Sequence, residues 1–176
     1  SDERTVTLGR EIQLLRDYME LQETRYAGRI KMEILSPDPS LETCTVPKFI
    51  LQPLVENAIL HGLKQRTQGG HIRVRVRRGR RGGICVTVTD NGCGMSREQV
   101  EKLSDPFFTT RKTRSVGLGV PFLKMLAVQT GGDVKITSRS EKEFPQDHGT
   151  TLTATFGLHH IDFIPLGDLT ETVVSL

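Results

Sequence analysis

Two stretches of alternating side chains, joined by a glycine-rich turn, constrain the fold of this 176-residue chain most strongly. Residues 72–77 alternate isoleucine and valine with arginine, and residues 84–89 continue the alternation with cysteine and threonine as the polar partners. Strict alternation is typical of a strand with one buried and one solvent-facing side. Because glycine and arginine fill residues 79–83 between the two stretches, we predict an antiparallel hairpin over residues 71–90.

Helical and strand patterns on both sides of the hairpin predict an α+β fold, with a mixed, mainly antiparallel sheet and helices on one face. The predicted helices cover about residues 7–26, 47–62, 96–103 and 120–130, and the further strands cover residues 29–35, a short segment ending near 46, 133–139 and 150–156. In the second helix we place Pro47 in the first turn, and we expect Pro53 to kink the segment around residues 50–52. The arginines of the hairpin are expected on the face that the helices leave bare.

Charge is distributed unevenly along the chain, although the net charge is only +3. From Asn57 to Thr89 there is no acidic residue and there are eight basic ones, so one region of the surface is strongly basic. An anionic ligand or an acidic partner domain is therefore one hypothesis for this region. Nucleic-acid binding through residues 73–81 is a second, which the absence of interleaved aromatic residues disfavours.

Cysteine usage and hydropathy indicate a protein of the cytoplasm. The three cysteines form no CxxC pair and have no histidine at metal-ligand spacing, which is typical of reduced thiols. No apolar run approaches the roughly 18 residues of a membrane span, and the polar start lacks a signal peptide. Since the chain begins with Ser1, we expect a piece of a longer protein, whose membrane attachment would come only from a segment outside this piece.

Three short motifs together offer the contacts that one nucleotide needs. Each motif alone is common at turns and helix ends: Glu56-Asn57 with His61, Asp90 with Gly92 and Gly94, and Gly117-Leu118-Gly119. In combination, the carboxylate of Asp90 can accept a hydrogen bond from an exocyclic amine such as that of adenine. The glycines let a base approach the backbone, and a helix N-terminus after the last motif suits phosphate. The amide oxygen of Asn57 is a hard ligand suited to Mg²⁺.

These motifs resemble the ATP-binding domain that gyrase, the heat-shock chaperone, histidine kinases and MutL share (GHKL superfamily, HATPase_c), which has the Bergerat α/β sandwich fold. The resemblance covers about residues 46–157, through LQPLVENAILHG (N box), VTDNGCGM (G1 box), DPFFTT (F box) and GLGV (G2 box). Upstream, LGREIQLLRDYMELQETRYAGRI followed by VPKFIL is similar to sensor histidine kinases of the LytS type. The resemblance implies the catalytic domain of a two-component sensor histidine kinase, which binds Mg²⁺-ATP and transfers the γ-phosphate to a histidine.

The resemblance also implies a role for each motif residue. Asn57 would bind Mg²⁺, and Asp90 would bind the adenine amine, with Thr150 helping through a water molecule. The glycine-rich segments would admit the base and the triphosphate: Gly92, Gly94, Gly117, Leu118 and Gly119. The segment between the last two glycine motifs would be the mobile lid, with these aromatic and basic side chains: Phe107, Phe108, Arg111 and Lys112.

Three side chains are candidates for catalysis, and each keeps a structural alternative. Glu56 is either a base or polar aid, or a solvent-facing charge of the helix. His61 either reaches a phosphate or ribose oxygen, or packs in the core and caps the helix. Lys112, with Arg111, either closes on the γ-phosphate or belongs to a solvated loop.

Two departures from the family pattern concern catalysis. ATP-hydrolysing members carry a glutamate four residues before the Mg²⁺-binding asparagine, and Pro53 takes that position here, which disfavours self-contained hydrolysis. The histidine that accepts phosphate in this kinase branch lies in an upstream helix, and no such segment is present in these residues. Both departures permit the alternative of a non-catalytic, nucleotide-dependent regulatory module.

The resemblance divides the chain into three expected regions. Residues 1–28 would end a dimerisation and phosphoacceptor hairpin, residues 29–158 would form the catalytic domain, and residues 159–176 are a tail without assignment. In that tail, His159, His160 and Asp162 form either a metal cluster or a turn. The expected partners are ATP, a response-regulator receiver domain, the upstream sensor segment and, in the parent protein, a second copy as a homodimer. No direct contact with nucleic acid is expected.

Overall fold

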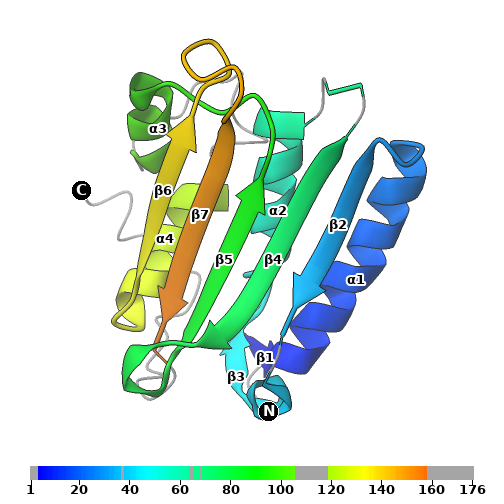
Figure 1. Cartoon of the computed structure of the whole chain (residues 1–176). Helices are drawn as coiled ribbons and strands as arrows, with labels where there is room; N and C mark the ends of the chain where they lie inside the picture. The colour runs from blue at the N-terminus through cyan, green and yellow to red at the C-terminus, as the bar shows by residue number, and fades with distance from the viewer. Residues whose placement is uncertain (1–3, 37, 64–65, 68, 106–118, 158–176) are drawn as a thin grey trace.

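A five-stranded sheet forms one layer of the protein. The computed structural model describes residues 4–36, 38–63, 66–67, 69–105 and 119–157. The strands of the sheet are β2 (Ile30–Leu35), β4 (Gly70–Arg78), β5 (Ile84–Asp90), β6 (Asp133–Arg139) and β7 (Gly149–Phe156). They lie in the order β2-β4-β5-β7-β6, with β2 parallel to β4 and the other neighbours antiparallel (Figure 1). The predicted α+β class with a mixed, mainly antiparallel sheet is therefore confirmed.

Strands β4 and β5 form the antiparallel hairpin that the alternation predicts. In the ladder Val74 pairs with Val88, and Arg75 pairs with Thr87. The valines and isoleucines of the hairpin are buried, whereas the arginines at the alternate positions of β4 are exposed. Successive side chains of a strand point to opposite faces, so the alternation gives the hairpin one apolar and one basic face.

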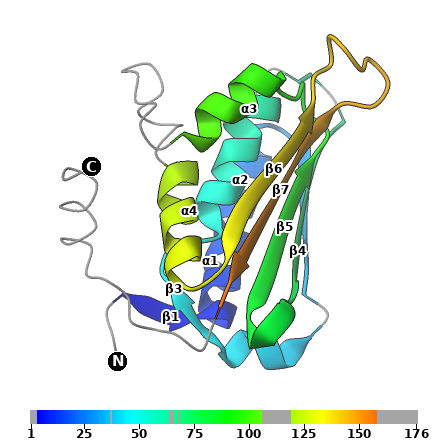
Figure 2. The same ribbon diagram turned by 90° about the vertical axis from the view of Figure 1, so that its left-hand side faces the viewer.

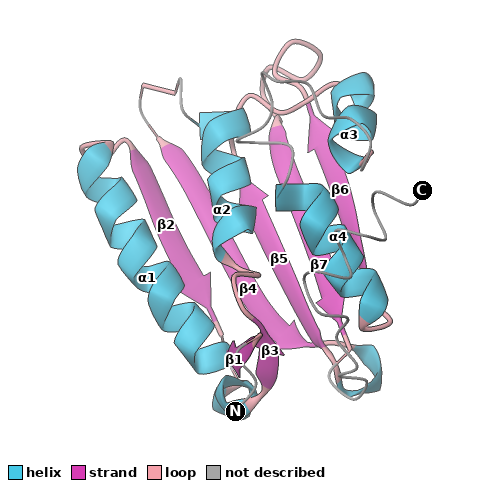
Figure 3. Cartoon of the chain, turned by 180° about the vertical axis from the view of Figure 1, so that it is seen from behind, coloured by secondary structure: helices cyan, strands magenta, loops and turns pink. Residues whose placement is uncertain are grey.

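Helices cover the apolar face of the sheet, as Figures 2 and 3 show. The helices are α1 (Leu8–Arg25), α2 (Gln52–Ala58), which continues as a π-helix (Ile59–Leu63), α3 (Arg97–Ser104) and α4 (Gly119–Gln129). Leu15, Leu54 and Leu123 bring α1, α2 and α4 into one core with the sheet. Each such leucine contributes about 1.5–3 kcal/mol by its burial.

The start of α2 differs from the prediction. Pro47 does not open a helix; it ends a short strand, β3 (Thr45–Pro47), and a loop over residues 48–51 follows. Helix α2 begins at Gln52 and has Pro53 in its first turn, so the predicted kink at that proline is wrong. A proline fits there because the first turn of a helix has no carbonyl partner for its N–H groups.

The N-terminal residues belong to the same core as the rest of the domain. Strand β1 (Thr5–Thr7), which the sequence analysis missed, pairs antiparallel with β3. Helix α1 follows it directly and buries Ile12 and Met19 in the common core. The expected boundary between residues 28 and 29 therefore stays a prediction about the functions of the two regions and does not separate two cores.

Local signals at α3 agree with the structure. Ser96 caps the helix by accepting a hydrogen bond from the Gln99 amide at 3.2 Å, and the Gln99 side chain accepts one from the Ser96 amide at 2.9 Å. This capping box is the one that the sequence predicts. Among the described residues, no helix has the length and apolar character needed to cross a membrane.

Candidate functional site

Asp90, the last residue of β5, is a carboxylate on the apolar side of the sheet. It is 7% exposed, and its Oδ1 accepts a hydrogen bond from the Gly92 amide at 2.8 Å. Burial raises the pKa of Asp90 to about 6, although hydrogen bonds from the backbone of Gly92 and Thr150 act in the opposite direction. A buried carboxylate with a raised pKa is a candidate for ligand binding, because a donor on the ligand stabilises the charged form.

Glycines let the chain segments around Asp90 touch through their backbones. A Cβ atom on Gly62, in the π-helix, would lie 2.8 Å from Oδ1 of Asp90, and one on Gly92 would overlap the backbone of Gly62. The amide of Cys93 donates to the Gly62 carbonyl at 3.1 Å. Gly62 ends the helix predicted over residues 47–62, and in the structure it also forms part of the wall beside Asp90.

Gly94 has a separate steric requirement. Its φ of +69° lies in the left-handed region, and a Cβ atom there would overlap the carbonyl of Arg139. Only glycine meets both conditions without strain. Gly94 thus fixes the loop after β5 against the end of β6.

Asn57 lies on α2, near the point where the helix turns into the π-helix. It is 6% exposed, and its Oδ1 has no hydrogen-bond partner among the described residues. A buried polar atom left without a partner costs about 1–3 kcal/mol, so a ligand that offered Oδ1 a partner would be bound favourably. A carbonyl oxygen fits a hard cation such as Mg²⁺. Within the described residues, no group of three His, Cys, Asp or Glu side chains could hold a metal ion, so phosphate or water oxygens would complete such a site.

Thr150 lies directly opposite Asp90 in the β5–β7 ladder. Its Oγ1 is 2.7 Å from Oγ of Ser138, which donates to the Gly149 carbonyl at 3.0 Å and accepts from the Met95 amide at 2.8 Å. Since the Ser138 hydroxyl has one proton, Thr150 donates to it and keeps its lone pairs for a water molecule. Sequence reasoning missed Ser138, although a polar residue at an inward position of β6 was the available signal.

His148 is a second neighbour of the site that the sequence analysis did not assign. Its Nδ1 donates a hydrogen bond to the Gly92 carbonyl, which requires the proton on Nδ1. Its Nε2 lies 3.9 Å from Oε1 of Glu141. The side chain thereby joins the start of β7 to the loop that follows Asp90.

The structure describes only some of the predicted catalytic and lid residues. The carboxylate of Glu56 accepts from the Gln52 side chain at 2.8 Å, and it lies near Tyr18 of α1. Burial, followed by the charge of Glu56, raises the pKa of Tyr18 to about 12. Gly119 begins α4, and the side chain of His61 is not described. Six predicted site and lid residues lie outside the described residues: Phe107, Phe108, Arg111, Lys112, Gly117 and Leu118.

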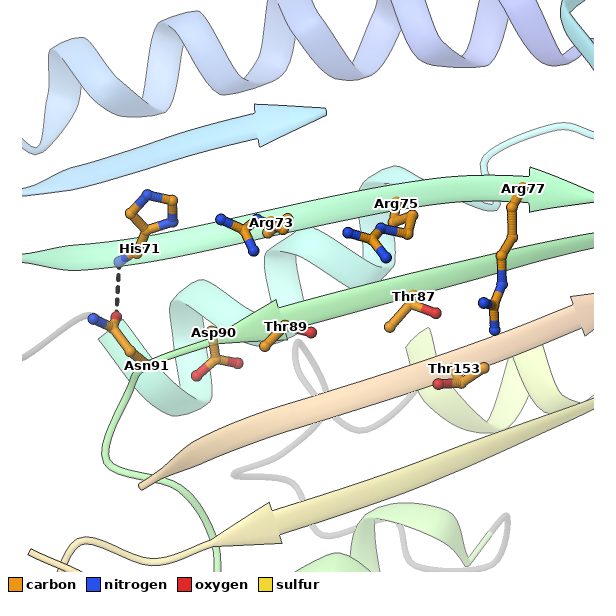
Figure 4. A pocket seen from close by; sticks show the side chains of 9 residues that line it. All are labelled: His71, Arg73, Arg75, Arg77, Thr87, Thr89, Asp90, Asn91 and Thr153. Atoms are coloured by element: carbon orange, nitrogen blue, oxygen red, sulfur yellow. Dashed lines mark hydrogen bonds between the residues drawn. The ribbon is translucent and has the colours of Figure 1, made fainter. Parts of the chain in front are cut away.

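The bare face of the sheet carries the predicted basic surface. A shallow hollow of about 660 Å³ lies there, and Figure 4 shows His71, Arg73, Arg75 and Arg77 in a row along β4. Nε of Arg73 is 2.5 Å from Oε1 of Glu33, and this hydrogen bond holds the pKa of Glu33 below its usual value. The expectation that the arginines occupy the uncovered face is confirmed.

Comparison with curated proteins finds bacterial relatives. The sensor histidine kinase YesM of Bacillus subtilis (strain 168) is 34% identical over 120 residues, which is 66% of this chain and 20% of YesM. The sensor histidine kinase/phosphatase LytS of Staphylococcus aureus (strain MRSA252) is 36% identical over 105 residues, which is 60% of this chain and 18% of LytS. The chain therefore spans about a fifth of the length of these relatives.

Solved structures share the fold at lower identity. The catalytic domain of the histidine kinase ThkA is 21% identical with a TM-score of 0.63, covering 90% of this chain and 98% of that one. A structure of ThkA in complex with the response regulator protein TrrA is 19% identical with a TM-score of 0.62, covering 90% of this chain and 42% of that one. A family model matches residues 47–160, well over half of the chain. The chain belongs to the histidine kinase-, DNA gyrase B-, and HSP90-like ATPase family.

Proposed function

We propose that this chain is the ATP-binding catalytic domain of a sensor histidine kinase, which transfers the γ-phosphate of ATP to a histidine on another segment. The observation that carries the proposal is the carboxylate of Asp90, buried on the apolar side of the sheet against the backbone of Gly62. The names of the curated relatives, both sensor histidine kinases, support the same function.

Asp90 recognises the base in this proposal. An exocyclic amine donates to the free acceptor sites of the carboxylate, while Gly92 keeps the carboxylate oriented through its amide. Such a hydrogen bond to a charged group is stronger than one between neutral groups. Thr150 supports the base through water, because its hydroxyl is committed as a donor to Ser138 and remains an acceptor.

Asn57 acts at the phosphates. Phosphoryl transfer depends mainly on positioning and on neutralising the charge of the phosphates, which bound Mg²⁺ supplies. The buried Oδ1 of Asn57 would hold this ion, since the described residues offer that atom no other partner. Helix α4, which begins at Gly119, presents its first amides to the triphosphate. The roles of Glu56, His61 and Lys112 in catalysis stay proposals.

The kinase function implies partners and a location. A receiver domain takes the phosphoryl group onward, in line with the complex of ThkA with the response regulator protein TrrA. The phosphoacceptor histidine comes from the upstream segment of a homodimeric parent, with residues 1–28 as its last part, 29–158 as the catalytic domain and 159–176 as a tail. The domain works in the cytoplasm, where ATP and receiver domains are found.

Calorimetric titration tests the nucleotide site. We expect saturable binding of ADP and of a non-hydrolysable ATP analogue, with tighter binding of the analogue when Mg²⁺ is present. Transfer of labelled γ-phosphate to the phosphoacceptor segment of the parent protein then tests the kinase function. Folded protein that binds neither nucleotide contradicts the whole proposal. Binding without transfer favours the regulatory module, which Pro53 at the position of the hydrolytic glutamate also permits.

A further inference from the structure

Helix α1 carries a charged residue on its buried face. Glu11 is 3% exposed and follows the spacing of Leu8 and Leu15, which are buried in the core. Burying a carboxylate is unfavourable unless hydrogen-bond donors meet it. The partners of Glu11 therefore show what this position does.

The carboxylate of Glu11 binds the loop before α2, 38 to 40 residues further along the chain. Its Oε1 accepts from the Phe49 amide at 2.7 Å, and its Oε2 accepts a longer hydrogen bond from the Leu51 amide at 3.5 Å. Phe49 has a φ of +62°, a strained conformation for a bulky residue, and it is 63% exposed. Because burial does little to hold Phe49, the hydrogen bond that its amide donates to Glu11 stabilises this loop conformation.

The loop leads directly into the helix that carries Asn57. Leu51, the residue before α2, has a side chain that makes no capping hydrogen bond to the helix, and it is buried together with Ile50. A helix behaves as a rigid rod over a few residues, so a shift of residues 49–51 moves Asn57 as well.

A second set of contacts ties the N-terminal residues to the same loop. The amide of Leu8 donates to the Cys44 carbonyl at 2.7 Å, and the amide of Lys48 donates to the Arg4 carbonyl at 3.0 Å. Between these contacts, β1 pairs with β3. Backbone hydrogen bonds thus link residues 4–11 to residues 44–51, and the side chain of Glu11 adds a further link between the two segments.

We propose that Glu11 is a positioning residue, which couples α1 to the nucleotide site by holding the loop of residues 48–51 and, through it, Asn57. This inference rests on the proposed function, because it assigns Asn57 to the Mg²⁺-dependent part of nucleotide binding. Movement of α1 relative to the sheet then changes affinity for the Mg²⁺-bound triphosphate more than affinity for the base.

The variant Glu11→Gln tests the coupling, with Glu20→Gln as the matched control on the exposed side of α1. The expected result is an about tenfold loss of the Mg²⁺-dependent gain in affinity for a non-hydrolysable ATP analogue, given the usual strength of hydrogen bonds to a charged group. Affinity for ADP without Mg²⁺ is expected to stay within about twofold of the control, since Asp90 keeps its contacts. Faster hydrogen exchange of the Phe49 and Leu51 amides would verify that the contact is broken. Faster exchange with an unchanged Mg²⁺-dependent gain would overturn the proposal.

A rescue variant separates positioning from general stability. Phe49→Gly removes the strain that drives the loop away from its conformation, so adding it to Glu11→Gln is expected to restore part of the lost gain. A purely stabilising role of Glu11 predicts no such rescue, and its absence would contradict the proposal.

The wild-type protein provides a measurement that does not depend on the folding of a variant. Coupling is reciprocal, so binding of the Mg²⁺-bound analogue is expected to slow exchange at the Phe49 and Leu51 amides, whereas ADP without Mg²⁺ is not. Equal exchange with both ligands would overturn the inference. Failure of the proposed function looks different, because wild-type protein would then bind neither nucleotide.

Discussion

The two faces of the β4–β5 hairpin differ in how much a polar residue reveals about function. On the outer face, Arg75 and Thr87 follow the alternation and lie in solvent beside a shallow hollow. On the inner face, Val74 and Val88 follow the same alternation, but Asp90 breaks it and is buried. The outer face holds most of the charge and the inner face holds the candidate chemistry. A polar residue is therefore most informative where the pattern calls for an apolar one.

The two faces also differ in the energetic cost of the charges that they carry. The pKa of Asp90 is raised from 3.8 to about 6, which corresponds to a cost on the order of 3 kcal/mol for keeping its charge buried at neutral pH. The ion pair of Arg73 with Glu33 on the outer face is half-exposed, and solvent screens such pairs, so they contribute little to stability. A buried charge is retained at this cost where a ligand makes use of it.

The largest expected effect comes from Asp90→Asn. Nucleotide affinity is expected to fall on the order of a hundredfold, because the charged acceptor for the base is lost. The melting temperature at pH 7 is expected to fall by no more than about 3 °C, since the amide oxygen still accepts from Gly92 and the buried charge is gone. Calorimetry and thermal unfolding measure both, with Asp17→Asn on the exposed side of α1 as the control. A large loss of stability without a loss of affinity would make Asp90 an ordinary core residue.

Replacing Asn57 by alanine should affect the phosphates and not the base. The Mg²⁺-dependent gain in triphosphate affinity is expected to fall about tenfold, because the oxygen proposed to bind the ion is removed. The free energy of unfolding should hardly change, as Oδ1 has no partner among the described residues.

Asn91→Ala is the matched control for this variant. The side-chain Oδ1 of Asn91 accepts from the backbone N–H of His71 at 2.8 Å, and its Nδ2 donates to the Gly69 carbonyl at 2.8 Å, so removing this side chain should cost about 1–3 kcal/mol of stability. Denaturant unfolding compares the two variants. An Asn57→Ala protein as unstable as Asn91→Ala would mean that the Asn57 side chain supports the fold.

The raised pKa of Asp90 predicts how binding depends on pH. ADP affinity should be constant above about pH 6 and fall up to about tenfold per pH unit below it, because the base donates to the charged form. The contribution of Asp90 to folding stability changes with pH in the opposite direction. The folded state holds the proton more tightly than the unfolded state, so the contribution of Asp90 is present at low pH and is lost as pH rises through about 6. Titration of Asp90→Asn, in which this step should vanish, identifies the group.

The smallest expected effects come from one substitution on each face of β4, which compare the two faces directly. Ile72→Val on the inner face is expected to lower the free energy of unfolding by about 1 kcal/mol, because it leaves a small cavity in the core. Arg75→Thr on the outer face should change it by less than about 0.5 kcal/mol. Denaturant unfolding of both variants checks this. A larger effect of Arg75→Thr would show that the outer face contributes to the fold.

Local patterns predicted much of the fold, whereas contacts distant in sequence were missed. The β4–β5 hairpin and the capping box of Ser96 and Gln99 were predictable, because each depends on neighbours a few residues apart. The true start of α2 was missed although Pro53 in its first turn is a local signal, whereas the contact of the preceding loop with Glu11, 38 residues before Phe49, is non-local. The parallel pairing of β2 with β4 is a non-local contact of the same kind.

The residues of the candidate site also divide into those with a local sequence signal and those whose role depends on contacts distant in sequence. Asp90 stood out because a charged residue ends an apolar strand, and the glycines after it mark a tight loop. Ser138 and His148 were not assigned: Ser138 offered only a polar residue at an inward position of β6, and the contacts of both with Thr150 of β7 and with the Gly92 carbonyl arise only in the folded chain.

Comparing ADP with inosine diphosphate tests the central claim most directly. Inosine carries a carbonyl where adenine carries its amine, so it offers Asp90 an acceptor in place of a donor. If Asp90 binds the amine, the wild-type protein should prefer ADP on the order of a hundredfold or more, and Asp90→Asn should lose most of that preference. Equal affinity of the wild-type protein for the two nucleotides would contradict the assignment of Asp90 to base recognition.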